Sequence, residues 1–400
     1  MSTFYASGKR GYGAIGKETT PGAAVIPGNF FYLESEGVTS PFENETVPVA
    51  ADSRAEEYFV VAGKNAAPSG PITMPIQVGT FGYFLTGMFG LPTTGSVSDS
   101  SYTHAWTSNN SGNIPTYSVD LGNGDAKYAR RYVGAHFGGL TANQKSNVHY
   151  AQLQLMARYS FVTATLQANL SIGATTAVLD TNYGLVVGDV FKLGFGTANE
   201  ETVTLTSVNA NGTGIGFLAI ASAKTAGDYC VLSNRTPSYS SSTPQIPWIG
   251  GTTTSIGGTL GTVAAVARFN EFTLNFNQKL EPEHAPGGTT DFSRYPVDIL
   301  VSSYSASASW SWLHKDVAYL DAMRQRTRLA LDITATGNLI GTASRDTLRY
   351  QIPKLVLDPS GAPLGGADIV REQHSGRAQY SSSDGFDIKV LITNAISTYA

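Results

Sequence analysis

The chain has 400 residues, enough for two or three domains, and 42 % of them are hydrophobic, enough for extensive cores. Charged residues make up only 14 % and the formal net charge is −4, which argues against a protein that holds nucleic acid by its overall charge. The single cysteine, Cys230, cannot form an internal disulfide, and no apolar run resembles a secretory signal or a membrane span, so we expect folding in a cytoplasm.

The first pattern along the chain is glycine-rich. Gly11, Gly13 and Gly16 satisfy G-x-G-x-x-G, a pattern found in nucleotide-binding loops. Glu18, however, stands where a phosphate-binding loop needs Ser or Thr, and residues 19–22 make a poor beginning for the helix that would hold the phosphate. We therefore predict a flexible N-terminal arm and no nucleotide.

Alternating apolar and polar residues then predict antiparallel strands in the first half of the chain. The predicted strands are 30–33, 72–78 and 148–161. Residues 80–89 carry an apolar stripe typical of a helix, although two glycines weaken it. A long polar loop at 34–70 separates the first two strands.

Residues 163–236 differ in character from the rest. They are rich in Thr, Ala, Val, Gly and Asn, and short strands are predicted at 190–193, 201–208 and 229–232 with turn signals between them. This pattern indicates a small all-β domain inserted at the end of a strand. Residues 238–247, with their serines and prolines, are interpreted as its exit linker.

The second half repeats the signals of the first. Strands are predicted at 272–280, 306–312, 348–352 and 386–392. Residues 315–326 predict a helix, with acidic residues early and basic residues late, as the helix dipole favours.

Each half thus presents a strand, a long polar loop, a second strand, a helix and further strands, in that order. We interpret this order as an internal duplication, although residue identity between the halves is low. The sequence predicts a mainly β protein: two tandem antiparallel β-sandwich or barrel units, 1–162 with its N-terminal arm and 237–400, each with a flanking helix, and the inserted small all-β domain 163–236 between them.

No combination of residues predicts catalysis, a cofactor or a resident metal. The histidines show no metal-ligand spacing, and no serine lies in a nucleophile elbow. A metal at 281–284 would need ligands from a neighbouring subunit. Residues 120–125 lack the acidic spacing of a calcium loop and are interpreted as a hairpin turn. The six histidines are His104, His136, His149, His284, His314 and His374.

Two groups of basic residues are the densest in the chain. They are Arg130-Arg131 and the stretch 324–328. We interpret both as a solvated face or the end of a helix. Together with the missing catalytic pattern, this leaves a protein that we expect not to be an enzyme.

Residues 16–27 read Gly-Lys-Glu-Thr-Thr-Pro-Gly-Ala-Ala-Val-Ile-Pro, and the aromatic strand 30–33 follows with Glu34-Ser35-Glu36 behind it. This stretch resembles the opening of the major tail tube proteins of long-tailed bacteriophages, in which G-K-E-T-x-x-G-T-A-V-x-P leads into an aromatic strand. Ala23 stands where threonine is commoner in that family.

Other parts of the chain are similar to the same family. They are the strand and helix of 69–90, the strand 272–280, the Ile352-Pro353-Lys354 segment and the closing strand to Asn394. The inserted segment 163–236 is not shared by every member, although small β inserts recur in phage structural proteins.

The resemblance implies units whose sheets join those of neighbouring subunits into a ring, and rings that stack into a tail tube. Such a tube surrounds the tape measure protein, meets tail terminator and tip proteins, and later conducts viral DNA without binding it specifically. Two units in one chain imply a homotrimeric ring with pseudo-sixfold symmetry rather than a hexamer. The resemblance places the protein in the virion, assembled in the host cytoplasm and without a membrane.

Two features of the residues agree with that expectation. A mildly acidic subunit suits a conduit for DNA, because a basic lumen would hold the phosphates. The loops 34–70 and 281–297 exceed ordinary loop lengths, so we expect them to make contacts between rings.

The alternative interpretation is a virion decoration protein or a host-surface, carbohydrate-binding β-sandwich protein. The inserted segment 163–236 supports it, because an added β domain could project outward and touch a host. Glycan binding by that segment, without tube formation by the rest, would favour this alternative.

Overall fold

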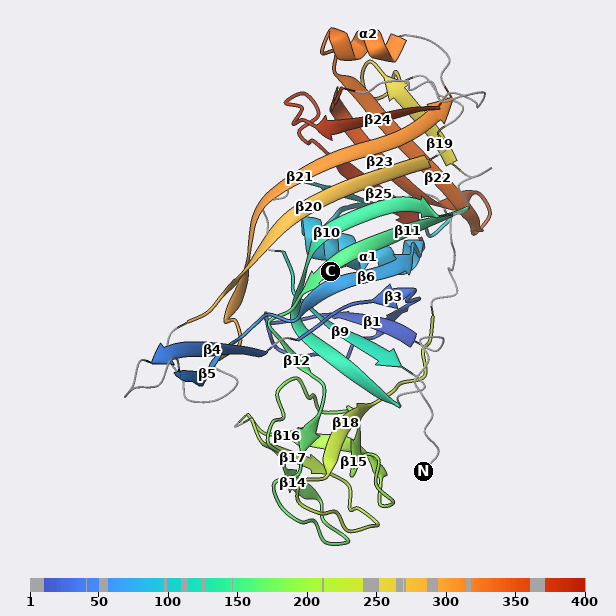
Figure 1. Cartoon of the computed structure of the whole chain (residues 1–400). Coiled ribbons are helices and arrows are strands. Elements are labelled where there is room, and N and C mark those ends of the chain that lie inside the picture. The colour runs from blue at the N-terminus through green and yellow to red at the C-terminus, as the bar shows by residue number, and fades with distance from the viewer. Residues whose placement is uncertain are drawn as a thin grey trace.

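The computed structural model confirms that the chain is mainly β, with two helices among the residues it describes. None of the described helices is long and apolar enough to cross a membrane. Figure 1 shows an elongated molecule, with residues of the second half at one end and residues of 164–233 at the other. The described residues are 11–40, 42–49, 57–96, 99–108, 114–123, 127–145, 147–210, 212–239, 252–263, 269, 271–285, 294–313, 318–359 and 371–399.

Six strands of the first half are antiparallel neighbours. In spatial order they are β1 (Gly11–Lys17), β9 (Tyr117–Asn123), β10 (Tyr128–Lys145), β11 (Val148–Met156), β6 (Ser69–Pro75) and β3 (Ser35–Glu36). Two short strands, β2 (Asn29–Phe31) and β12 (Tyr159–Phe161), pair with β1 and β10. The helix α1 (Val78–Phe89) follows β6 and is buried at every position but Tyr83, so the predicted helix 80–89 is confirmed.

Six strands of the second half are antiparallel neighbours as well. In spatial order they are β19 (Thr252–Gly257), β22 (Leu329–Ile340), β23 (Ser344–Leu357), β24 (Arg371–Ala378), β21 (Asp298–Leu313) and β20 (Glu271–Glu283). The strand β25 (Lys389–Asn394) continues beside β23 past the end of β24. The helix α2 (Ala318–Arg324) follows β21; of the helix predicted at 315–326, residues 315–317 lie outside the described part.

The two halves share one hydrophobic core. β10 pairs with β20, with Gly139 opposite Asn277 and Asn143 opposite Thr273. A second joint pairs β25 with β8 (Tyr102–Thr107), which in turn pairs with β7 (Thr93–Ser96). Apolar side chains from both halves form a single buried cluster as a result; among them are Ile72, Phe84, Leu140, Phe276 and Tyr350.

The glycine-rich stretch is a strand, which corrects the prediction of a flexible arm for residues from Gly11 onward. β1 pairs with β2 on one edge and β9 on the other. The Phe31 ring packs so closely over Gly13 that a Cβ there would lie 2.1 Å from a ring carbon. The glycine therefore serves close packing, and residues 18–22 after it form a bend and turn instead of a phosphate-binding helix.

The middle segment has a hydrophobic cluster of its own, which also takes in Ala129 and Phe161 from β10 and β12. Its sheet is continuous with β10, because Tyr128 and Ala129 pair with Ser233 and Leu232. Figure 1 places it at the end of the molecule opposite α2. Its strands are β13 (Ala164–Thr165), β14 (Thr176–Val178), β15 (Val190–Leu193), β16 (Glu201–Val208), β17 (Gly214–Phe217) and β18 (Tyr229–Ser233). The linker predicted at 238–247 lies outside the described residues from 240 onward.

Both regions predicted as long loops contain strands. The first holds β4 (Phe42–Val49) and β5 (Glu57–Asn65), which form a two-stranded sheet that no other described strand joins. In the second, β20 runs on to Glu283, opposite Asp298 at the beginning of β21. The first hairpin includes the apolar run from Tyr58 to Val61, which the prediction of a polar loop passed over, and the second extends the predicted strand 272–280.

Candidate functional site: a buried ionic junction

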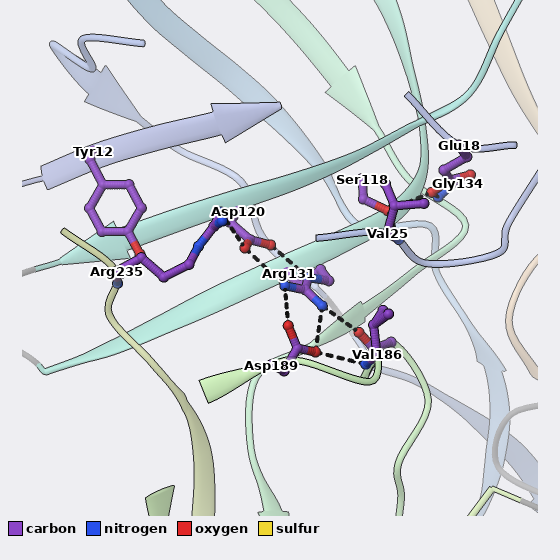
Figure 2. Close-up of polar contacts among 11 residues, drawn as sticks. Tyr12, Glu18, Val25, Ser118, Asp120, Arg131, Gly134, Val186, Asp189 and Arg235 are labelled. Carbon is purple, nitrogen blue, oxygen red and sulfur yellow. Dashed lines mark hydrogen bonds and ion pairs between the residues drawn. The ribbon is translucent and has the colours of Figure 1, made fainter. Parts of the chain in front are cut away.

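A buried arginine connects the two hydrophobic clusters. Arg131, on β10, donates from Nε and Nη2 to the carboxylate of Asp120 on β9, at 2.7 and 3.0 Å. It donates from Nη1 and Nη2 to the carboxylate of Asp189, in the loop before β15, at 2.7 and 2.9 Å. A further bond from Nη1 to the carbonyl of Gly184 uses its fifth N–H. Figure 2 shows the guanidinium between the two carboxylates.

A second arginine, Arg235, lies near the C-terminal end of the middle segment and also contacts Asp120. Nη2 of Arg235 donates to Oδ2 of Asp120 at 3.1 Å, and its backbone N–H donates to the hydroxyl of Tyr12 on β1 (Figure 2). The guanidinium of Arg235 also lies over the ring of Phe30. The segment is therefore held to the β1–β9–β10 sheet by side chains at two places, Asp189 and Arg235.

The charges of this junction balance. Two arginines face two aspartates, and the Arg131 and Asp189 side chains are only 1 % and 3 % exposed. Burial by itself lowers the pKa of Arg131, but the carboxylates of Asp120 and Asp189 outweigh it and raise that pKa above its ordinary value. Removing one partner of such a pair strands a buried charge and costs about 3–5 kcal/mol.

A buried carboxylate lies near the junction. Glu18 accepts hydrogen bonds from the hydroxyls of Thr116 and Ser118 and from the backbone N–H groups of Gly22 and Gly134, at 2.7–2.8 Å. Figure 2 shows Glu18 with Ser118 and Gly134. Glu18, the residue that departs from the phosphate-loop pattern, thus connects the turn after β1 to β9 and β10 by hydrogen bonds.

A cavity of about 920 Å³ lies where the two halves meet, lined by residues of α1, β10, β20 and β21. His136 Nδ1 and Gln278 Oε1 are buried in its wall without a hydrogen-bond partner among the described residues. Burial lowers the pKa of His136 to about 4, so its ring is neutral at pH 7.

The other histidines in the described part lie apart from one another. His104 is hydrogen-bonded to Thr94 and to the carbonyl of Ile396, and His149 lies 3.2 Å from the Thr252 hydroxyl. His374 pairs with Glu372, His284 lies at the end of β20, and His314 is outside the described residues. In the described ranges no three His, Cys, Asp or Glu side chains gather in a way that could hold a metal ion.

Arg131 corrects one prediction. It was expected on a solvated face but is buried in the junction, whereas Arg130 is partly exposed and pairs with Glu36. Residues 324–328 are exposed at the end of α2, as predicted. The predicted hairpin is confirmed, because Asn123 at the end of β9 lies opposite Tyr128 at the beginning of β10.

Cys230 is buried on β18. Comparison with protein-family models and with curated protein sequences gave no significant match.

Proposed function

We propose that this chain is a structural subunit that assembles with copies of itself into rings, and that the rings stack into the tail tube of a bacteriophage virion. In this proposal three chains form one ring, in which 1–162 and 237–400 act as tandem units and give pseudo-sixfold symmetry. The tube surrounds the tape measure protein and conducts DNA. The chain supplies contacts and shape and carries out no chemistry.

The observation that carries the proposal is the strand order common to the two halves. The order β1-β9-β10-β11-β6-β3 in the first half matches β19-β22-β23-β24-β21-β20 in the second, and a helix follows β6 and β21 alike. Matched strands also occur in the same order along the chain. A shared topology at low identity is what an internal duplication leaves behind.

The joint between the halves is head to tail. A central strand of the first half, β10, pairs with an edge strand of the second, β20, so the two halves use different strands for one contact. A contact of this kind repeats from copy to copy, and it closes into a ring when its rotation divides a full turn. Closure would pair sheet edges that are open in the single chain and so reduce the risk of aggregation there.

Two protruding hairpins support the stacking of rings. β4–β5 in the first half and the distal part of β20–β21 in the second occupy matching places in the strand order. An isolated two-stranded hairpin is marginally stable in water, so a partner surface would stabilise β4–β5. Ser302, Ser303, Tyr304 and Ser305 on β21 are all exposed, so both faces of that strand are uncovered.

Electron microscopy of the purified chain tests the proposal. We expect rings or short tubes whose projection shows six similar lobes, and native mass spectrometry should give three chains to a ring. A monomer that persists at high protein concentration would contradict the proposal. Rings of six chains would contradict only the trimeric stoichiometry.

A further inference from the structure

We infer that two sheet edges of this chain are completed by a second copy of it: residues 37–39 of one copy pair antiparallel with the end of β23, residues 356–358, of another. This inference rests on the proposed function and names the contact that would hold the ring together. It is carried by the joint inside the chain, which has a counterpart in each half where no described strand completes the pairing.

Inside the chain, one edge of β10 is shared by two strands. β9 pairs with it from Tyr128 as far as Ala135, and β20 then takes over from Gly139 to Asn143. The other edge carries β12 and β11. The end of β10 is therefore covered on both sides, and Leu140 lies between Leu153 of β11 and Phe276 of β20.

β23 is the strand of the second half that matches β10. It has a neighbour that corresponds to β9, but none of the described strands corresponds to β20. β22 pairs with it as far as Leu355, where Leu329 lies opposite. β24 pairs with Leu355 on the other edge and continues to Leu357. Beyond Leu355 no described strand continues the β22 side, and the Val356 side chain is 37 % exposed.

The strand of the first half that matches β20 is β3. It has a strand partner on one edge and no described strand partner on the other. β20 uses one edge for β21 and the other for β10. β3 and the residues after it use one edge for β6, through Ser35, Glu36 and a bridge from Thr39 to Ser69. No described strand pairs with the other edge, where the N–H of Val38 donates to the carboxylate of its neighbour Glu36 at 3.0 Å.

Side chains fix the register. In the internal joint Leu140 lies opposite Phe276, and both face the shared core. The corresponding positions are Leu357, which packs against that core, and Val38, which is buried in it. This alignment places Val356 of one copy opposite Thr39 of the next, and both are exposed in the single chain.

A second copy is the occupant because each edge lacks what the other supplies. One copy offers a strand end and its neighbour offers an edge strand, and neither has a described strand partner there. Val38 is only 4 % exposed, so the Glu36 carboxylate that accepts from its N–H must move aside for the two strands to pair as β10 and β20 do. Pairing them repeats the internal joint between chains, so every central strand end around the ring is covered in the same way.

Disulfide trapping tests the contact, because a cross-strand pair brings Cα atoms within the reach of a disulfide. The variant carries Thr39→Cys and Val356→Cys, and the native Cys230 is buried, with a pKa that burial raises to about 12, so it stays unreactive. After assembly and mild oxidation, a non-reducing gel should show linked dimers and trimers, and no larger species. Each single variant should remain monomeric on the gel.

A second pair, Gly37→Cys with Asp358→Cys, samples the adjacent register position. The matched control pairs Thr39→Cys with Leu339→Cys, since Leu339 is 51 % exposed at the far end of β22 and should not cross-link. Rings by microscopy without cross-links in either pair would overturn this inference and leave the proposed function standing. Equal cross-linking in the control would also overturn it, and a chain that forms no rings would overturn both.

Discussion

Arg131, on β10, and Asp189, in the middle segment, meet in a bidentate ion pair, with N–O distances of 2.7 and 2.9 Å. The pair joins residues that are far apart in the sequence, and it lies in protein interior that excludes water from both side chains. Its effect is to fix how the middle segment sits on the β9–β10 hairpin. The first prediction concerns this pair.

Replacing Asp189 by Asn should lower the free energy of unfolding by about 3–5 kcal/mol, because Arg131 would remain buried with half of its countercharge removed. Chemical denaturation of the purified variant measures the loss. The control is Glu200→Gln, which breaks the more exposed Lys192–Glu200 pair and should cost less than about 1 kcal/mol. Similar losses in both variants would show that the junction contributes no special stability.

Deleting 164–235 should leave ring assembly intact only when the surface that the segment covers is made polar as well. The deletion removes Asp189 and Arg235 together, so Arg131 and Asp120 remain as a balanced pair, but it removes the β18 pairing from β10 and uncovers Ala129 and Phe161. We expect the bare deletion to aggregate, and the deletion combined with Phe161→Ser to form rings. Loss of rings from the combined variant, if it is still folded by circular dichroism, would show that the segment belongs to the ring contact.

Gly13→Ala should destabilise the first sheet by about 1–3 kcal/mol, since the added Cβ would overlap the Phe31 ring. The matched control is Gly28→Ala, where an added Cβ would meet no atom within 4 Å. Thermal unfolding of both variants measures the difference. Equal melting temperatures would contradict the packing role assigned to Gly13.

The free energy of unfolding should decrease as the pH is lowered from 6.5 to 4. Burial lowers the pKa of His136 and of His149 to about 4, so the unfolded chain binds more protons than the folded one in this range. Each histidine contributes stability that is present above its unfolded pKa and is lost as pH falls, on the order of 3 kcal/mol by pH 4. Burial raises the pKa of Asp346 to about 6, which acts in the opposite direction in the same range.

The measurement is unfolding free energy against pH, repeated for His136→Gln combined with His149→Gln. The double variant should show a flatter or reversed slope below pH 6.5. An unchanged slope would mean that other groups govern the acid response.

Alternation located the strands well, because each strand buries one face against the shared core. Glu201–Val208 and Val190–Leu193 have the predicted ends, and the inward residues of β20, such as Leu274, are buried. The glycine-rich β1 escaped this reasoning because its side chains are small and both edges are paired. Its dependence on Phe31 is a contact across the sheet that periodicity along the chain does not encode.

The ionic junction could be predicted only in part. A hairpin was predicted there, but its turn was placed at 120–125, whereas the strands pair outward from Asn123 and Tyr128. Asp120 lies opposite Arg131 only in that observed register. Asp189 is brought to them by the packing of a separate cluster, and nothing in its local sequence indicates an arginine partner. The assignment of Arg131 to a solvated face was wrong for that reason.

β10 is one uninterrupted strand of 18 residues, and its two ends serve different parts of the molecule. β18 of the middle segment pairs at Tyr128 and Ala129, whereas β20 of the second half pairs from Gly139 to Asn143. A mechanical force applied to the middle segment would therefore be transmitted along the backbone of β10 toward the joint between the halves. The flanking strands would have to slide past β10 with many hydrogen bonds strained together, so the chain should resist tension along this line better than peeling at an edge.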